Sequence, residues 1–137
     1  HIIVVEQLDN MNTSSLDKEA WLKSRKYILE ALNRGIDSHS EKDVFYAIAR
    51  GDAQLWTGQQ SACVTEIVTY PNYKMIRFWL GGGDLEELKE MEKPICEWAK
   101  SIGCEKSMIL GRKGWSKIKH ENRTYKEVGT ISIRSLL

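Results

Sequence analysis

Long apolar runs, paired cysteines and an excess of charge of one sign are all missing from this sequence of 137 residues. No stretch approaches the ~18 consecutive apolar residues of a membrane span, so we expect no membrane association. The 20 basic residues nearly cancel the 19 acidic ones, whereas proteins that bind nucleic acid usually carry a clear basic excess. Nucleic acid is therefore an unlikely partner, supported only by the basic, partly aromatic segment 111–126.

The three cysteines, Cys63, Cys96 and Cys104, are odd in number and include no closely spaced pair. They form neither a disulfide framework nor, with three scattered histidines, a zinc site. We expect reduced thiols that pack as small hydrophobes. The N-terminal HIIVVEQL contains too short an apolar run for a signal peptide, so the expected location is cytoplasmic.

Hydrophobic periodicity predicts a single α/β (α+β) domain over residues 1–137, since the length suits one domain and no linker or repeat interrupts it. The expected order is β-α-α-β-β-β-α-β-α-β, with a mixed, mostly antiparallel central sheet flanked by helices. The expected elements are strand 2–5, helices 16–33 and 41–51, strands 53–56, 62–69 and 75–80, helix 84–102, strand 106–111, helix 114–122 and strand 125–137.

A strand, three glycines and a helix N-terminus follow one another around LGGGD, Leu80 to Asp84. These are the parts of a phosphate site, because the free amides of a first helical turn attract anions. Asp84 is also a suitable N-cap, whose carboxylate would use the same amides and repel a phosphate. The glycines therefore either hold a phosphate or only let the chain turn.

Glu66 is the main candidate for proton transfer. It alternates with Val64 and Val68 and so shares their face of an interior strand. Burial there would make its carboxylate more basic, which suits a group that takes a proton from an amine. The alternative is that Glu66 pairs with Arg77 across the sheet or points to solvent.

Three further residues are candidates near the C-terminus. Arg112 and Lys113 follow the predicted strand 106–111, where ligand-contacting loops gather in open α/β sheets. They either bind the phosphates of a nucleotide-like ligand or are simply solvated. His120 could donate a proton near neutral pH, or it lies on the surface without a role.

The element order, with a long helix after the fourth strand, resembles the GNAT superfamily of N-acyltransferases and the small GNAT-like proteins of tailed phages. The residue-level resemblance runs from Met75 to Tyr125. In that superfamily acyl-CoA lies between the splayed fourth and fifth strands, and its pyrophosphate sits on amides at the start of the long helix. The resemblance thus implies acetyl-CoA as cofactor, bound at Leu80, Gly81, Gly82 and Gly83.

The chain departs from the family pattern at two places. The family loop has an Arg or Gln, two residues, then Gly-x-Gly or Gly-x-Ala, whereas no suitable Arg or Gln precedes Gly81. Aligning Tyr125 with the family's aromatic residue after the next helix puts His120 at the proton-donating tyrosine and Lys113 at an asparagine. Glu66 matches the glutamate that GNAT enzymes commonly carry on a central strand as general base.

The resemblance leaves two functions open. The first is acyl-CoA-dependent N-acetyltransfer, in which an amine attacks the thioester directly, Glu66 takes the amine proton, and amides near Leu80 to Gly82 hold the oxyanion. The second is a catalytically degenerate GNAT-like phage protein, acting as an assembly, virion-associated or host-modulating binding module. Its partner would be a phage or host protein, in the host cytoplasm or the virion. The sequence does not identify the acceptor amine.

Overall fold

The computed structural model describes residues 17–110, 119–120 and 123–137. Within these residues the chain has an α+β fold with a four-stranded mixed sheet, three helices and a small two-stranded hairpin. The elements are α2 (Lys18–Asn33), α3 (Glu41–Ala49), β1 (Gln54–Thr57), β2 (Ser61–Thr69), β3 (Lys74–Gly83), α4 (Leu85–Ser101), β4 (Lys106–Ile109), β5 (Lys119–His120) and β6 (Arg123–Thr124).

The sheet has the strand order β1-β2-β3-β4. Its first three strands form the antiparallel meander that the sequence predicts, and α4 then carries the chain over to β4, which lies parallel to β3. The pairing of β3 with β4 ends at Phe78 and Ile109. Among the described residues, the remainder of β3, from Trp79 to Gly83, therefore has no strand on that side.

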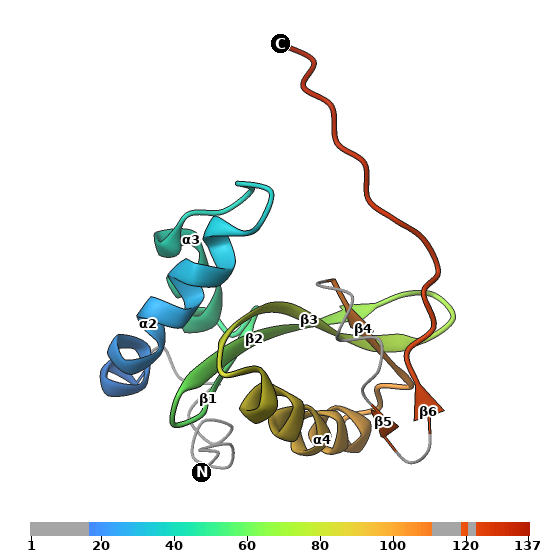
Figure 1. The fold of residues 1–137 in the computed structure, drawn as a ribbon. Helices are drawn as coiled ribbons and strands as arrows, with labels where there is room; N and C mark the ends of the chain where they lie inside the picture. The colour runs from blue at the N-terminus through green and yellow to red at the C-terminus, as the bar shows by residue number, and fades with distance from the viewer. Residues whose placement is uncertain (1–16, 111–118, 121–122) are drawn as a thin grey trace.

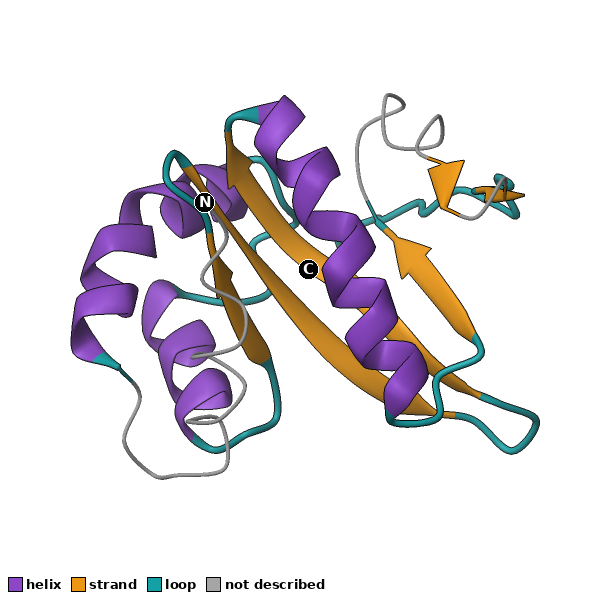
Figure 2. Cartoon of the chain, turned by 90° about the horizontal axis from the view of Figure 1, so that it is seen from below, coloured by secondary structure: helices purple, strands orange, loops and turns teal. Residues whose placement is uncertain are grey.

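Helix α4 covers one face of the sheet, and α2 and α3 cover part of the other (Figures 1 and 2). Because side chains alternate along a strand, each strand supplies both layers. Trp56 of β1 and Phe78 of β3 face α4, where they pack with Met91 and Ile95. Leu55, the neighbour of Trp56, belongs to the cluster on the α2 side. Both faces of the sheet are thus buried where helices cover them.

Each helix begins at a capping side chain. The carboxylate of Asp17 accepts from the N–H of Glu19 at α2. Ser40 and Asp43 form a reciprocal capping box at α3, which the sequence predicts from their spacing. Asp84 accepts from the N–H of Glu86 at α4 (3.3 Å), so the predicted role of Asp84 as an N-cap is confirmed.

The prediction that the strand ends at Leu80 is wrong, because β3 continues through all three glycines. Gly81, Gly82 and Gly83 pair with successive residues of β2. A Cβ on Gly82 would lie 2.2 Å from the carbonyl oxygen of Tyr27, and Gly83 has φ +100°. Gly82 is needed because the backbone of α2 lies directly against β3, and Gly83 because other residues rarely adopt its φ.

The C-terminal expectations are also corrected. Lys119 and His120, predicted as helical, form β5 and pair with β6, while most of the predicted helix 114–122 lies outside the described residues. Beyond Tyr125 the chain forms no strand, contrary to the predicted strand 125–137, and it runs away from the domain (Figure 1). The predicted strand 2–5 lies outside the described residues. No described helix has the length and apolar character to cross a bilayer.

Replacing Gly82 by alanine tests the close packing of α2 on β3. The new Cβ meets backbone rather than a flexible side chain, so α2 must move, and we expect a loss of about 2–3 kcal/mol in the free energy of unfolding. Urea unfolding followed by circular dichroism measures it. Gly129→Ala is the matched control, since a Cβ there meets nothing within 4 Å. Equal stability of the two variants would contradict this packing.

Candidate functional site

Carboxylates of the chain itself surround the start of α4, where the resemblance places a pyrophosphate. Asp84 caps the helix, and Glu86 and Glu87 lie in its first turn. Glu87 reaches back to the turn between β1 and β2, where its carboxylate accepts from the N–H groups of Gln59 and Gln60, both at 3.0 Å. It also accepts from the hydroxyl of Ser61.

These hydrogen bonds fix the charge of Glu87. Burial alone would raise the pKa of Glu87, but the hydrogen bonds from Ser61 and from the amides of Gln60 and Gln59 outweigh it, so this pKa lies below its ordinary value. Glu87 is therefore ionised at neutral pH and carries its charge beside a helix N-terminus, where negative charge is favourable. The start of α4 favours negative charge, and carboxylates of the chain itself provide that charge.

Other groups of the chain also contact the part of β3 that has no pairing with β4, from Trp79 to Gly83. The guanidinium of Arg34, which ends α2, donates from Nη2 to the carbonyl oxygen of Gly81 (2.8 Å). Tyr27 covers Gly82 and Gly83, and Leu80 packs against the cluster on the α2 side. The four residues predicted to hold acyl-CoA thus contact α2 and do not form an open loop between β3 and α4.

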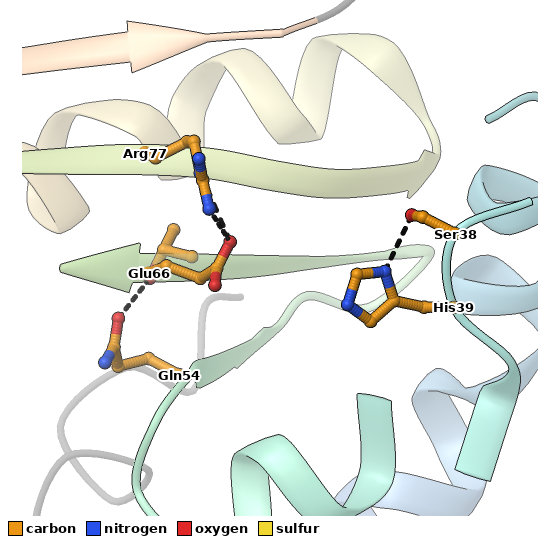
Figure 3. A network of polar contacts seen from close by, with 6 residues as sticks. Ser38, His39, Gln54, Glu66 and Arg77 are labelled. Atoms are coloured by element: carbon orange, nitrogen blue, oxygen red, sulfur yellow. Dashed lines mark hydrogen bonds and ion pairs between the residues drawn. The ribbon is translucent and has the colours of Figure 1, made fainter. Parts of the chain in front are cut away.

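Glu66 and Arg77 form a cross-strand ion pair (Figure 3). Oε1 of Glu66 accepts from Nη2 (2.7 Å) and Nε (3.2 Å) of Arg77. The side chains are 26% and 31% exposed, respectively. Glu66 is therefore half-buried rather than buried, and the pairing that the sequence left as an alternative is the one found. Both groups remain accessible from solvent.

Trp79, two residues after Arg77 in β3, makes an aromatic contact. Trp79 is the extra residue of a β-bulge, because the partners of Val64 and Thr65 in β3 are Leu80 and Phe78. The half-buried ring of Trp79 meets the ring of His39 edge-on, with centroids 4.7 Å apart.

His39 belongs to the loop between α2 and α3, and its Nδ1 shares a hydrogen bond with Ser38 Oγ (2.7 Å; Figure 3). On the other side, Met108 of β4 lies in register with Arg77. We call the surface formed by Glu66, Arg77, Trp79, His39 and Met108 the ion-pair face.

A buried polar cluster lies on the α4 side of the sheet. Glu92 is only 2% exposed, and its Oε1 accepts from the hydroxyl of Tyr125 (3.0 Å) and the thiol of Cys96 (3.0 Å). The Tyr125 hydroxyl also shares a hydrogen bond with Ser107 of β4 (2.8 Å). Burial raises the pKa of both Tyr125 and Cys96, so both keep their protons. The cluster ties α4, β4 and the segment after β6 together.

Three features of the site have no counterpart among the residues that the sequence singles out, namely Arg34, Glu87 and the Glu92 cluster. A signal for Glu92 exists, since it lies four residues after Leu88 on the buried stripe of α4. For Arg34 and Glu87 there is none, because their partners are distant in the chain. The cysteines are free thiols, as predicted, and burial raises the pKa of Cys63 to about 12.

Of the remaining predicted site residues, the structure describes only the backbone of His120. The backbone of His120 lies in β5 opposite Arg123. Arg112 and Lys113 lie outside the described residues, so their phosphate-binding role stays a prediction. Among the residues that the structure describes, no group of three histidine, cysteine, aspartate or glutamate side chains could hold a metal ion.

Comparison with known proteins supports the fold alone. No protein-family model and no curated protein matches this chain. The crystal structure of a point mutant of TTHA1254 from Thermus thermophilus is similar, with a TM-score of 0.60, 12% sequence identity, and coverage of 88% of this chain and 94% of that chain. The α+β architecture therefore recurs in a solved structure, at an identity too low to carry function.

Glu87→Gln tests the charge and the hydrogen bonds of Glu87 at the start of α4. The pKa of Glu87 in the folded state is lowered from 4.5, so its stabilisation is complete above that value and is lost as the pH falls through the folded-state pKa. The variant should lose about 1 kcal/mol at neutral pH and show a shallower decline of stability toward acid. Urea unfolding over a pH series measures this.

Glu90→Gln is the matched control, an exposed carboxylate on the same helix. It should follow the wild-type decline. If the wild type and Glu87→Gln lost stability in parallel on acidification, Glu87 would not hold the charge assigned to it.

Proposed function

We propose that this chain is a protein-binding module with a GNAT-like fold, and that it does not use acyl-CoA. The observation that supports the proposal is at the start of α4, where Asp84 caps the helix and Glu86 and Glu87 lie in the first turn, the place at which the resemblance would put a cofactor pyrophosphate. A phosphate about 4–5 Å from a carboxylate is repelled by on the order of 1 kcal/mol even in water, and three carboxylates are present. Of the amides in the first turn, that of Glu86 is already bonded to the Asp84 carboxylate.

The edge of β3 supports the same proposal. A pantetheine arm lying along β3 would hydrogen-bond to backbone groups of Trp79 to Gly83, but Arg34 holds the Gly81 carbonyl at 2.8 Å. Displacing Arg34 would also separate it from Glu30, its ion-pair partner at 2.6 Å. Acyl-CoA would therefore have to break contacts within the chain before making its own, which lowers its affinity.

The ion-pair face is the surface that we assign to the partner. Arginine, tryptophan and methionine are enriched at protein interfaces, and Arg77, Trp79 and Met108 occur together there. The half-exposed pair of Glu66 and Arg77 can meet a partner that presents both charges in the opposite order. In line with the resemblance to phage proteins, the partner class is a phage or host protein, and the expected location stays the host cytoplasm or the virion.

Acyl transfer is the second candidate, and one observation favours it. Beyond Phe78, no described strand pairs with the outer side of β3, which leaves an edge where GNAT enzymes hold acetyl-CoA. Glu66 would then take the proton of an acceptor amine as the amine attacks the thioester carbonyl, and the C–S bond would break to release coenzyme A as its thiolate. This reaction requires Arg34 to release the Gly81 carbonyl. It also requires Glu66 to act as a base while Arg77 holds its carboxylate.

Calorimetric titration with acetyl-CoA and with coenzyme A separates the two functions. We expect no saturable heat and no change in Tm at ligand concentrations near 1 mM, a range that covers weak specific binding. The double variant Glu86→Gln, Glu87→Gln should bind more tightly than the wild type if carboxylates exclude the anion. Saturable binding to the wild type, with acetylation of an added amine, would replace the proposal by the acyltransferase function.

Exchanging the two charges of the ion-pair face tests the partner assignment. Glu66→Arg combined with Arg77→Glu keeps a cross-strand pair and reverses the charges offered to a partner, so the fold should persist while binding is lost. Affinity purification from the producing cells, with quantitative mass spectrometry, compares this variant with the wild type. Glu90→Arg on the exposed side of α4 is the control. A partner retained equally by both variants would exclude this face.

A further inference from the structure

The C-terminal segment Thr130–Leu137, called the tail, exposes apolar side chains that a folded domain usually buries. Ile131 and Ile133 are 67% and 64% exposed, and Leu136 is 85% exposed. The tail is extended and points away from the domain (Figure 1). Its hydrogen bond from the N–H of Leu137 to Ser135 Oγ (3.2 Å) is local.

The tail nevertheless has the pattern of a half-buried strand. In TISIRSLL, Ile131 and Ile133 share one face of an extended chain with Ser135 and Leu137, while Thr130, Ser132, Arg134 and Leu136 lie on the other, so the alternation is strict over Thr130–Arg134. β-branched residues with one charge and no proline favour pairing with an open sheet edge. A segment of this kind left in water is a template for association.

The same chain carries an open edge that such a strand can complete. β4 is the last strand of the four-stranded sheet, and its outer side has no strand among the described residues. Met108 and Ile109 of β4 are half-buried, and Leu110 is 43% exposed. An added strand on this edge would satisfy backbone groups of β4, and its apolar face would extend the α4-side layer to which Ile109 belongs.

We propose that the tail pairs with the β4 edge of a second copy of this chain, and that the exchange is reciprocal. Tail and edge are complementary parts of one molecule, so two copies related by a two-fold axis satisfy both edges and both tails at once. A foreign partner of the tail would leave β4 open. The assembly therefore closes as a dimer and does not continue as a fibre.

The base of the tail explains why its own edge is not the acceptor. Tyr125 is held by Ser107, in β4, and by Glu92, so the tail starts beside its own β4. To pair there it would have to reverse direction within Lys126–Gly129, whereas it leaves the domain extended (Figure 1). An extended chain covers up to about 3.3 Å per residue, which lets it reach the edge of an adjacent copy.

Analytical ultracentrifugation over a concentration series tests the exchange. A short added strand forms a small interface, so we expect a weak dimer. The full chain should become dimeric as its concentration is raised to about 100 µM. Ile131→Lys with Ile133→Lys should weaken the dimer at least about tenfold. Thr130→Lys with Ser132→Lys adds the same charge on the opposite face and should leave it unchanged. A monomeric wild type, or equal loss in both double variants, overturns the proposal.

Disulfide cross-linking identifies which copy receives the tail. Ser132→Cys in one tagged copy and Met108→Cys in a differently tagged copy should give a covalent heterodimer on oxidation. A single chain carrying both cysteines should instead form cross-linked dimers and little internal disulfide when diluted. An internal disulfide that persists on dilution would show that the tail docks on its own β4, and absence of any cross-link would exclude the β4 edge.

Discussion

The close approach of α2 to β3 is the constraint on which the rest of the structure depends. The carbonyl oxygen of Tyr27 lies 2.2 Å from where a Cβ of Gly82 would be, so only a glycine at this position lets the helix lie this close. Arg34, at the end of the same helix, then reaches the Gly81 carbonyl. Gly81 to Gly83 thus form the end of β3, against which α2 packs. The chain then continues into α4 through Asp84 with no intervening loop.

The same constraint decides how the start of α4 is used. A strand that runs directly into a helix holds the first helical turn beside the β1–β2 turn, so Glu87 can accept from Gln59 and Gln60. The positive end of the helix dipole is thus compensated within the chain. In the function proposed above, a partner would meet the ion-pair face, where Glu66 and Arg77 remain half-exposed, in place of an anion site.

Much of the fold could be predicted from the sequence, because the signals for it are local. The capping box of Ser40 and Asp43 and the meander β1–β3 follow from spacing within a few residues. The prediction ended β3 at Leu80 because three glycines usually mark a turn, and it extended a strand over 125–137 because alternation does not reveal whether a partner exists. For the candidate site, the prediction found Glu66 and its pairing alternative but neither Arg34 nor Glu87.

By itself, the sequence determined the α+β architecture, the order of the described helices and main strands, the cap at Asp84 and the free state of the thiols. Each depends on neighbours within one element or on composition. Only the tertiary structure decided that Gly81 to Gly83 receive α2, that Glu66 binds Arg77 and that Glu92 is buried with Tyr125. These contacts join residues from separate elements, and whether a backbone amide or a strand edge is occupied depends on groups that only folding brings near.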